Sequence, residues 1–332
     1  MKAIRLHDFG GPEVLRHEEV PIPVPAPGEV LVRVKAVGLN PPDWYVREGM
    51  PGVPPAFKPP FDLPLIPGTD ISGVVEAVAA DVQDFAAGDE VVGLLRFPGL
   101  MQSGAYAQYV TAPATDLAPK PSGVDHAHAA GLPMSGLTAW QYLIEVGHDH
   151  PSPFQEARHR PSPLGSGTTV LINGAGGGVG HLALQLAKWK GARVIAVASG
   201  AHEEFLRDLG ADEYIDYTEQ RPEDIVRDVD LVLDAVGGPA SRRFLPTLRR
   251  GGALYPVYFG EFDDAENEKL GVTVTGTQVR ASGAQLAELG SLLDAGVLRV
   301  AIDSTFTLAD ARAAHQRAAQ GHIQGKIVLT VP

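Results

Sequence analysis

The sequence predicts an α/β protein built from a β-rich domain and a doubly wound parallel-sheet domain. At 332 residues the chain is longer than a single core usually serves. Its first ~125 residues consist of short apolar runs separated by turn residues, a pattern typical of β-structure. After Pro133 short apolar strands alternate with helical patterns, which favours a parallel sheet.

In the first domain, residues 29–37 show the clearest strand. The two faces of this segment differ: Val30, Val32, Val34 and Ala36 alternate with Leu31, Arg33 and Lys35. Pro and Gly are frequent between Pro51 and Pro67, which disfavours a helix or a central strand there. We interpret this stretch either as a loop over a cleft or as a plain surface excursion.

The second domain is expected to repeat strand and helix. The predicted strands are 169–173, 193–198, 230–235, 253–257 and 272–276, and the predicted helices lie near 179–190, 203–209, 238–249 and 284–293. Residues 146–167 are rich in His, Pro and Ser and read as an inserted loop before the first of these strands.

The C-terminal segment fits the first domain better than the second. Leu308 to Ala319 reads as a helix, and Gly325 to Val331 reads as a final strand. We therefore expect a discontinuous first domain, residues 1–125 and 300–332, around a nucleotide-binding domain at residues 126–299.

Composition excludes several classes of function. The net charge of −13, without clustered Lys and Arg, disfavours nucleic acid and an anionic membrane as partners. The chain has no Cys, which excludes disulfides, thiolate nucleophiles and metal sites that need a Cys ligand. The first residues do not resemble an apolar signal segment, so we expect a cytoplasmic protein.

A glycine-rich loop is the strongest motif. It follows the predicted strand 169–173 and opens a predicted helix: Gly174, Ala175, Gly176, Gly177, Gly178, Val179 and Gly180. Ala175, Gly177 and Gly180 form an A-x-G-x-x-G variant of the dinucleotide fingerprint. In it, a small residue makes the tight turn, Gly177 lets backbone approach the pyrophosphate, and Gly180 permits close helix–strand packing. The alternative is a flexible glycine-rich turn.

The end of the next strand favours NADP(H) over NAD(H). NAD sites usually carry Asp or Glu there, about 20 residues after the loop, to bind the ribose 2′-hydroxyl. This chain has Ser199 instead, with His202 and Tyr217 nearby. A small hydroxyl leaves room for a 2′-phosphate, although no Lys or Arg occupies the turn.

These motifs resemble those of the medium-chain dehydrogenase/reductase superfamily, in its quinone oxidoreductase (zeta-crystallin-like) branch. The matching segments are 38–44 (GLNPPDW), 66–73 (IPGTDISG), 104–110 (GAYAQYV), 136–140 (GLTAW), 209–212 (LGAD), 234–238 (DAVGG) and 321–326 (GHIQGK), together with the glycine loop. The resemblance spans nearly the whole chain. It implies a GroES-like substrate domain, a Rossmann domain and a homodimer.

The resemblance also implies roles for single residues. Asn40 and Asp43 would line the cleft near the nicotinamide, and Thr138 would contact its carboxamide or ribose. Other cofactor contacts would come from Val236, Val257, Tyr258 and Lys326. For Asn40 and Asp43 the alternative is a local turn bond to backbone. Tyr45 could donate a proton to a developing enolate, or simply pack in the core; solvent is the simplest proton source.

The zinc ligands of alcohol dehydrogenases in this superfamily are missing. Those enzymes carry Cys at the position of Asn40 and Gly-His-Glu at the position of Gly68-Thr69-Asp70. Without a Lewis acid the expected chemistry is hydride addition to an electron-poor acceptor, a quinone or an α,β-unsaturated carbonyl. The alternative is a non-enzymatic NADPH-binding sensor or structural protein, since a cofactor fold does not prove turnover.

Overall fold

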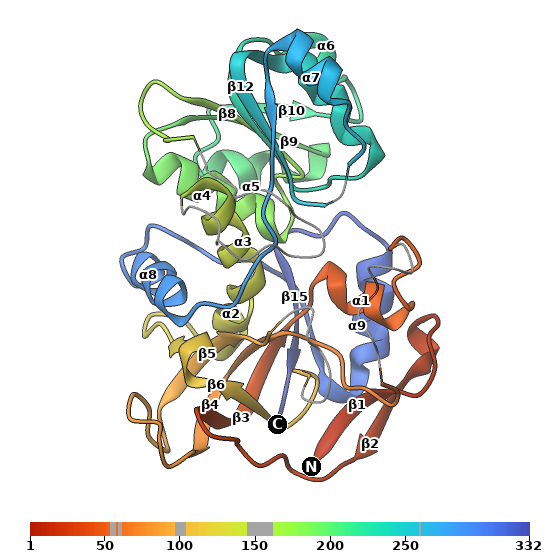
Figure 1. Cartoon of the computed structure of the whole chain (residues 1–332), viewed down its shortest axis with the longest axis vertical. Coiled ribbons are helices and arrows are strands. Elements are labelled where there is room, and N and C mark those ends of the chain that lie inside the picture. Colours follow the sequence, from red (N-terminus) through yellow and green to blue (C-terminus); the bar gives the residue numbers. More distant parts are fainter. Residues whose placement is uncertain (54–57, 59–61, 97–103, 145–161, 259) are drawn as a thin grey trace. The chain divides into compact units, whose positions relative to one another are not determined.

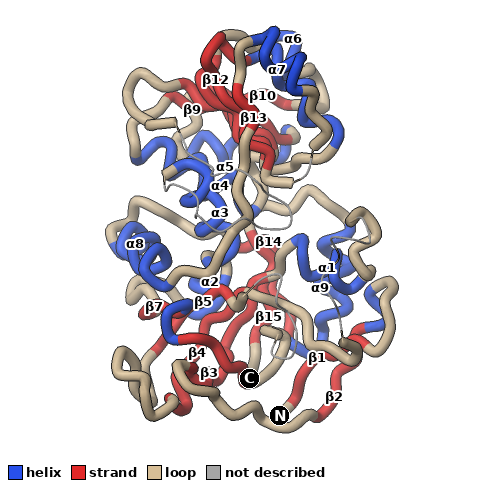
Figure 2. Tube along the Cα trace, viewed as in Figure 1, coloured by secondary structure: helices blue, strands red, loops and turns tan. Residues whose placement is uncertain are grey.

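Two large sheets of different type organise the described residues, and a small two-stranded antiparallel sheet accompanies them (Figure 1). The computed structural model describes residues 1–53, 58, 62–96, 104–144, 162–258 and 260–332. It divides into unit 1, residues 1–137 and 279–332, and unit 2, residues 138–278. Unit 1 contains mainly antiparallel strands and unit 2 a parallel sheet, so the predicted α/β class is confirmed (Figure 2).

Unit 1 is built from both ends of the chain, and both termini lie in it (Figure 1). Its strands are β1 (Lys2–Leu6), β2 (Leu15–Glu19), β3 (Glu29–Gly38), β4 (Asp70–Val78), β5 (Glu90–Leu94), β6 (Tyr109–Pro113), β7 (Leu117–Pro119), β14 (Ile302–Thr307) and β15 (Lys326–Thr330). Its helices are α1 (Pro41–Arg47), α2 (His126–Ala130), α8 (Gly283–Asp294) and α9 (Ala311–Ala319), while α3 (Pro133–Leu143) runs across the boundary with unit 2.

The main sheet of unit 1 has the order β14-β15-β3-β4-β5-β7, and β6 also pairs with β3. The inward face of β3 is the one that its alternation predicts, because Val30, Val32, Val34 and Ala36 are all almost fully buried. Burial of such side chains contributes roughly 1.5–3 kcal/mol each for the larger ones. The expectation that the C-terminal strand returns to the first domain is met, since β15 pairs with β3.

Strand register places polar residues together at one end of this sheet. Gly38 pairs with Asp70 on β4 and with Val328 on β15. Lys326 precedes Val328 by two residues, and Asn40 follows Gly38 by two, so antiparallel pairing sets them opposite each other. Position 38 is crowded, since a Cβ there would lie 2.3 Å from the carbonyl oxygen of Ala130. This close packing explains why the residue is glycine.

Unit 2 has the strand order of a Rossmann fold. Its strands are β8 (Thr169–Asn173), β9 (Arg193–Ala198), β10 (Glu213–Asp216), β11 (Val229–Asp234), β12 (Leu248–Pro256) and β13 (Thr273–Val274). They pair in parallel in the order β10-β9-β8-β11-β12-β13. Its helices are α4 (Gly178–Trp189), α5 (Glu203–Asp208), α6 (Pro222–Ile225) and α7 (Asp264–Leu270). The carboxyl ends of β8 and β11 meet at the point where the strand order reverses, which is where such sheets bind ligands.

Several predicted bounds differ from the observed ones. The two units divide at 137/138 and 278/279, not at 125/126 and 299/300. The reason is that α2 packs on β3 and β4, while α8 packs on β7. The predicted helix 238–249 is a 3-10 helix, Pro239–Thr247, which contains Pro246. The inserted loop 146–167 and the Pro-rich stretch 51–67 lie partly outside the described residues.

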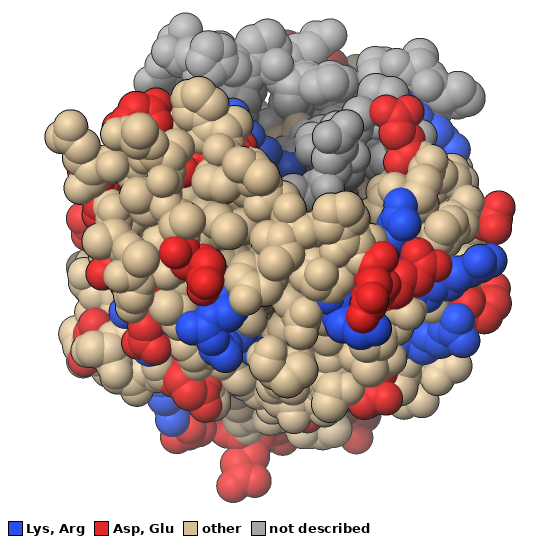
Figure 3. Space-filling view, turned by 90° about the horizontal axis from the view of Figure 1, so that it is seen from below, with Lys and Arg blue, Asp and Glu red and all other residues tan. Residues whose placement is uncertain are grey.

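The surface carries interspersed charges. On the face shown in Figure 3, basic side chains lie next to acidic ones and form no broad basic area. In unit 1, Lys2 pairs with Glu19 and Arg33 pairs with Glu76. None of the helices formed by the described residues combines the length and hydrophobicity that a membrane span requires.

Candidate active site and nucleotide-binding loop

The first candidate residues lie at the start of α1. Asn40 is the N-cap of this helix, and its backbone N–H donates to Asp43 Oδ2 at 3.0 Å. This bond satisfies one of the N–H groups that a helix start leaves unpaired. Both side chains are buried, Asp43 completely. The local turn bond that was the alternative for Asn40 and Asp43 is therefore present, and it does not exclude a role of both residues in a site.

Lys326 joins this cluster from β15. Its Nζ donates to Asn40 Oδ1 at 2.5 Å and lies 3.5 Å from Asp70 Oδ2. Asp70 Oδ1 in turn accepts from the backbone N–H of Met134 at 3.0 Å. The structure thus brings together Asn40, Asp43 and Lys326 within unit 1. Lys326, which the resemblance assigns to the cofactor, lies among the residues predicted to be catalytic.

Burial sets the ionisation of this cluster. It raises the pKa of Asp43 to about 7, although the Asn40 N–H bond opposes the rise. Burial likewise raises the pKa of Asp70 and lowers that of Lys326, while the attraction between these two opposes both changes. Among the described residues, Asp43 Oδ1 and Thr69 Oγ1 are buried without a hydrogen-bond partner.

A chain of hydrogen bonds leads from Asp43 to α9. The Tyr106 hydroxyl lies 3.1 Å from Asp43 Oδ2 and 3.0 Å from His315 Nε2. His315 Nδ1 is 2.9 Å from Arg47 Nη1. Sequence patterns assign no site role to Tyr106, His315 or Arg47. Their signal was weak, because each reads alone as an ordinary polar residue and they lie up to 268 residues apart.

Tyr45 is only partly buried on α1, and its ring meets the edge of Trp44 with centroids 6.1 Å apart. This contact favours the packing alternative over proton donation.

In unit 2 the glycine loop connects β8 to α4. Gly174 has φ +72°, so the tight turn is made by Gly174 and not, as we expected, by Ala175, which is fully buried. A Cβ on Gly180 would lie 2.2 Å from the Gly174 carbonyl oxygen, which explains the glycine by helix–loop packing. A Cβ on Gly177 would meet only this oxygen, at 3.5 Å. Packing within the fold therefore does not require glycine at position 177, whereas a ligand that comes close to the backbone would require it.

Two of the other predicted nucleotide residues of unit 2, His202 and Val236, lie against this loop, and a third lies against the turn after β11. His202 lies against Gly176, Val236 against Gly174, and Tyr258 against Gly237. The remaining residues extend from neighbouring strand ends: Ser199 follows β9, the Tyr217 N–H donates to Ala198, and the Val257 N–H donates to Asp234. Thr138 is buried on α3. Apart from Thr138, these residues share the carboxyl edge of the parallel sheet.

Sequence patterns assign no site role to two carboxylates of unit 2. Asp234, at the end of β11, accepts from Asn173, Ser241 and the backbone N–H groups of Val236 and Gly237, and so holds the turn after this strand. Asp216, at the end of β10, lies beside Gly200, where a Cβ would be 2.5 Å from Asp216 Oδ2. A carboxylate is therefore present near Ser199 after all, on the neighbouring strand.

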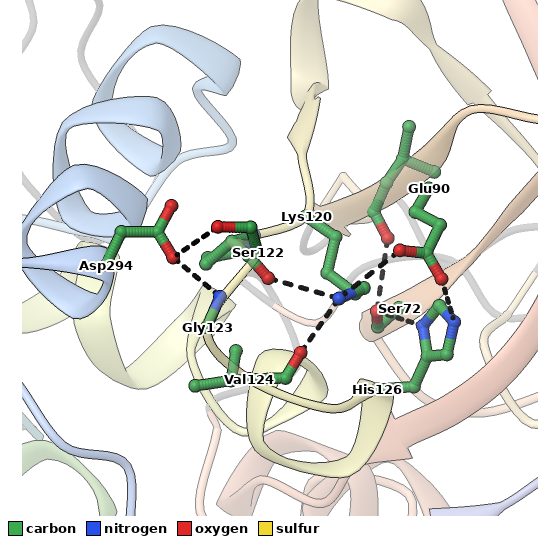
Figure 4. Close-up of polar contacts among 10 residues, drawn as sticks. Ser72, Glu90, Lys120, Ser122, Gly123, Val124, His126 and Asp294 are labelled. Atoms are coloured by element: carbon green, nitrogen blue, oxygen red, sulfur yellow. Dashed lines mark hydrogen bonds and ion pairs between the residues drawn. The ribbon is translucent and has the colours of Figure 1, made fainter.

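A second polar cluster in unit 1 has the residue types of a hydrolase triad (Figure 4). His126 Nδ1 lies 2.8 Å from Ser72 Oγ, and His126 Nε2 lies 3.1 Å from Glu90 Oε1. Ser72 is fully buried, however, and its hydroxyl also donates to the Val91 carbonyl. The single proton of this hydroxyl is therefore not donated to His126, as it would be in a triad, and we interpret this cluster as a link between β4, β5 and α2.

The positions of the alcohol dehydrogenase zinc ligands carry other residues in this chain. Asn40 Oδ1, at the position of the Cys ligand of alcohol dehydrogenases, accepts from Lys326, and Thr69 takes the place of the His ligand. A basic nitrogen that donates to a prospective ligand opposes a metal cation at the same oxygen. Within the described residues, no group of three or more His, Cys, Asp and Glu side chains could hold a metal ion.

The fold and these two sites define a two-domain dehydrogenase/reductase. Family models agree: residues 26–122 match the alcohol dehydrogenase GroES-like domain, and residues 209–329 match a domain described as zinc-binding dehydrogenase. Quinone oxidoreductase QR1 of Triphysaria versicolor is 33% identical over 344 residues, covering 99% of this chain and 98% of its own.

Two further proteins are similar over the whole chain. The NADPH-dependent alkenal/one oxidoreductase of Arabidopsis thaliana is 31% identical, covering 99% of this chain and 79% of its own. The Escherichia coli quinone oxidoreductase solved with NADPH has a TM-score of 0.83 and 28% identity, covering 99% of this chain and 100% of its own. The chain belongs to the medium-chain dehydrogenase/reductase superfamily, in its quinone oxidoreductase branch.

Proposed function

We propose that this protein is a zinc-independent, NADPH-dependent reductase of quinones or α,β-unsaturated carbonyls. The observation that carries the proposal is the bond from Lys326 Nζ to Asn40 Oδ1, which occupies the position of a zinc ligand. A site without a Lewis acid suits acceptors that are already electron-poor. The named relatives, a quinone oxidoreductase and an alkenal/one oxidoreductase, support both acceptor classes.

NADP(H) fits the glycine loop. The first N–H groups of α4 have no partners within the helix and would face the phosphate groups of a dinucleotide bound at its N-terminus. The open position at Gly177 leaves room for the pyrophosphate, and Ser199 and His202 would lie toward the adenosine end. The relative solved with NADPH and the NADPH-dependent relative support this cofactor.

The bound cofactor supplies a hydride, and the reduced acceptor must also take up one proton. Asp43 is the group of the site that is suited to hold this proton near neutral pH, because burial raises its pKa to about 7. Water then replaces the proton. Asn40 and Lys326 hold the start of α1 in place through their mutual bond.

A spectrophotometric assay tests the proposal. The decrease in NADPH absorbance is followed in the presence of the enzyme and each member of a panel of quinones and enones. We expect oxidation of NADPH that depends on the acceptor. Addition of a zinc chelator should leave the rate unchanged. Tight NADPH binding without oxidation by any acceptor would instead favour the alternative, a non-enzymatic NADPH-binding protein.

Assembly and location belong to the same proposal. We expect a homodimer, as in the family, and a cytoplasmic location, although the plant relatives are named as chloroplastic. Sedimentation velocity tests the first expectation, because a dimer has twice the 35.1 kDa of the chain. Fractionation of cells that express the protein tests the second.

A further inference from the structure

In the chain of hydrogen bonds from Arg47 to Asp43, the donor of each bond lies on the side of Arg47. Arg47 is almost fully buried, and a guanidinium can only donate. Its Nε donates to the Gly10 carbonyl at 3.0 Å, Nη2 donates to Glu48, and Nη1 lies 2.9 Å from His315 Nδ1. His315 Nδ1 must therefore be the acceptor in this contact.

The acceptor role of Nδ1 fixes the tautomer of His315. Burial, followed by the Arg47 charge, lowers the pKa of His315 to about 3, so the ring is neutral and has one N–H. That proton lies on Nε2 and is donated to the Tyr106 oxygen, 3.0 Å away. The Tyr106 hydroxyl then has its own proton free to donate to Asp43 Oδ2, at 3.1 Å.

We propose that His315 is a positioning residue that turns the Tyr106 hydroxyl toward Asp43 and so keeps the exchangeable proton of Asp43 on Oδ1. Oδ2 already accepts two hydrogen bonds, from Tyr106 and from the Asn40 N–H, whereas Oδ1 has no partner among the described residues. The inference rests on the proposed reductase only for the use of this proton by the reduced acceptor.

The geometry that supports this proposal comes from distant parts of the chain. Arg47 is at the end of α1, Tyr106 precedes β6, and His315 is on α9. The Tyr106 ring lies against Gly68, where a Cβ would be 2.3 Å from its Cδ1, so the ring is held in place. Burial raises the pKa of Tyr106 well above its ordinary value, which keeps the hydroxyl protonated.

The other charged groups that act on Asp43 are Asp70, on β4, and Lys326, on β15. Asp70 raises the pKa of Asp43 and Lys326 lowers it. All variants of the test leave these two residues in place, so a change in titration reports on the Tyr106 and His315 end of the chain. The ring of Trp44, 6.5 Å from that of His315, carries no charge.

The test is a carbon-13 titration of the Asp43 carboxyl in the full-length protein, assigned with Asp43→Asn. Tyr106→Phe and His315→Phe should each raise the Asp43 pKa, by about one unit for Tyr106→Phe, because a bond to the charged form is lost or weakened. His315→Gln should stay close to wild type, since its amide oxygen can accept from Arg47 while its nitrogen donates to Tyr106.

Nitrogen-15 shifts of the wild-type imidazole provide a test that needs no variant to fold. We expect the neutral Nε2–H form between pH 5 and pH 9. A neutral Nδ1–H form, or an Asp43 titration unchanged in Tyr106→Phe, would overturn the inference. The pH profile of NADPH oxidation should shift in the same order as the titrations. Absence of turnover with every acceptor would count against the proposed reductase while the titrations still decide the role of His315.

Discussion

At the scale of single residues, the buried Lys326–Asp70 pair is the feature with the largest expected energetic effect. Both side chains are at most 3% exposed and lie 3.5 Å apart. Removal of one partner from a buried pair leaves the other without compensation, which typically costs 3–5 kcal/mol. The pair also supports Asn40, to which Lys326 donates.

We expect Lys326→Met to lower the free energy of unfolding by roughly 3–5 kcal/mol at pH 8. The loss should shrink as the pH falls, because Asp70 then takes up a proton and no longer needs a positive partner. Urea unfolding at several pH values measures it. The double variant Lys326→Met/Asp70→Asn is the control and should recover part of the loss; equal losses in both variants would contradict the pairing.

Asp43 should make stability fall as the pH rises. Its pKa is about 7 in the folded protein and 3.8 for an unperturbed carboxyl, so between these values the native state keeps a proton that the unfolded chain has released. The difference corresponds to about 4 kcal/mol, present below pH 4 and lost as the pH rises through 7. Asp43→Asn should flatten this part of the curve of unfolding free energy against pH. A wild-type slope retained in Asp43→Asn would contradict the assignment.

Asp216 should weaken the preference for NADPH over NADH. Its carboxylate lies beside Gly200, next to Ser199, and a negative charge there opposes a 2′-phosphate. We expect Asp216→Asn to bind NADPH roughly two- to fivefold more tightly, with NADH affinity little changed. Calorimetry with both cofactors measures this difference. The same change in both affinities would indicate that Asp216 does not face the phosphate.

The residues of the site were only partly predictable. Asn40 and Asp43 could be selected because they stand in a short motif at a helix start. The bond from Lys326 to Asn40 could not, since it depends on the register of β3 and β15, which are separated by most of the chain. His315 and Tyr106 were missed for the same reason: their meeting is a property of tertiary packing.

At the scale of elements, the parallel sheet followed closely from the sequence. Strands 169–173 and 193–198 were predicted with their observed bounds, because buried parallel strands are short continuous apolar runs between turn residues. Strand β10, Glu213–Asp216, was missed because it is short and half polar. The helix expected at 238–249 is a 3-10 helix, since Pro246 removes a backbone donor.

The glycine loop allows binding and folding to be separated. A Cβ at Gly177 meets nothing closer than 3.5 Å and its φ is −81°, so Gly177→Ala should fold with near wild-type stability. Its affinity for NADPH should nevertheless drop at least about tenfold, because the backbone can no longer approach the pyrophosphate.

Gly180→Ala is the matched variant, since its Cβ would lie 2.2 Å from the Gly174 oxygen. It should lower stability by about 1–3 kcal/mol as well as weaken binding. Thermal unfolding and NADPH titration of both variants decide the matter. Full NADPH affinity in Gly177→Ala would refute the assignment of this loop.

At the scale of the whole molecule, the two units are built from the chain in different ways. Unit 2 is a single continuous segment, residues 138–278, with its own apolar core around Leu171, Val232 and Leu254. Unit 1 needs both ends of the chain, because β15 pairs with β3 and contributes Lys326. We therefore expect unit 2 to fold without the last thirty or so residues, whereas the candidate active site of unit 1 should not form without them.

Deletion of residues 301–332 tests this asymmetry. The deletion removes β14, α9 and β15, uncovers the edge of β3, and leaves Asp70 without Lys326 in a buried position. Edge exposure and an uncompensated carboxyl should together unfold unit 1. In hydrogen exchange followed by mass spectrometry, we expect β3 and β4 to lose protection while β8, β9 and β11 keep it. If β3 and β4 stayed protected in the truncated chain, the C-terminal segment would be an accessory to unit 1 and not part of its fold.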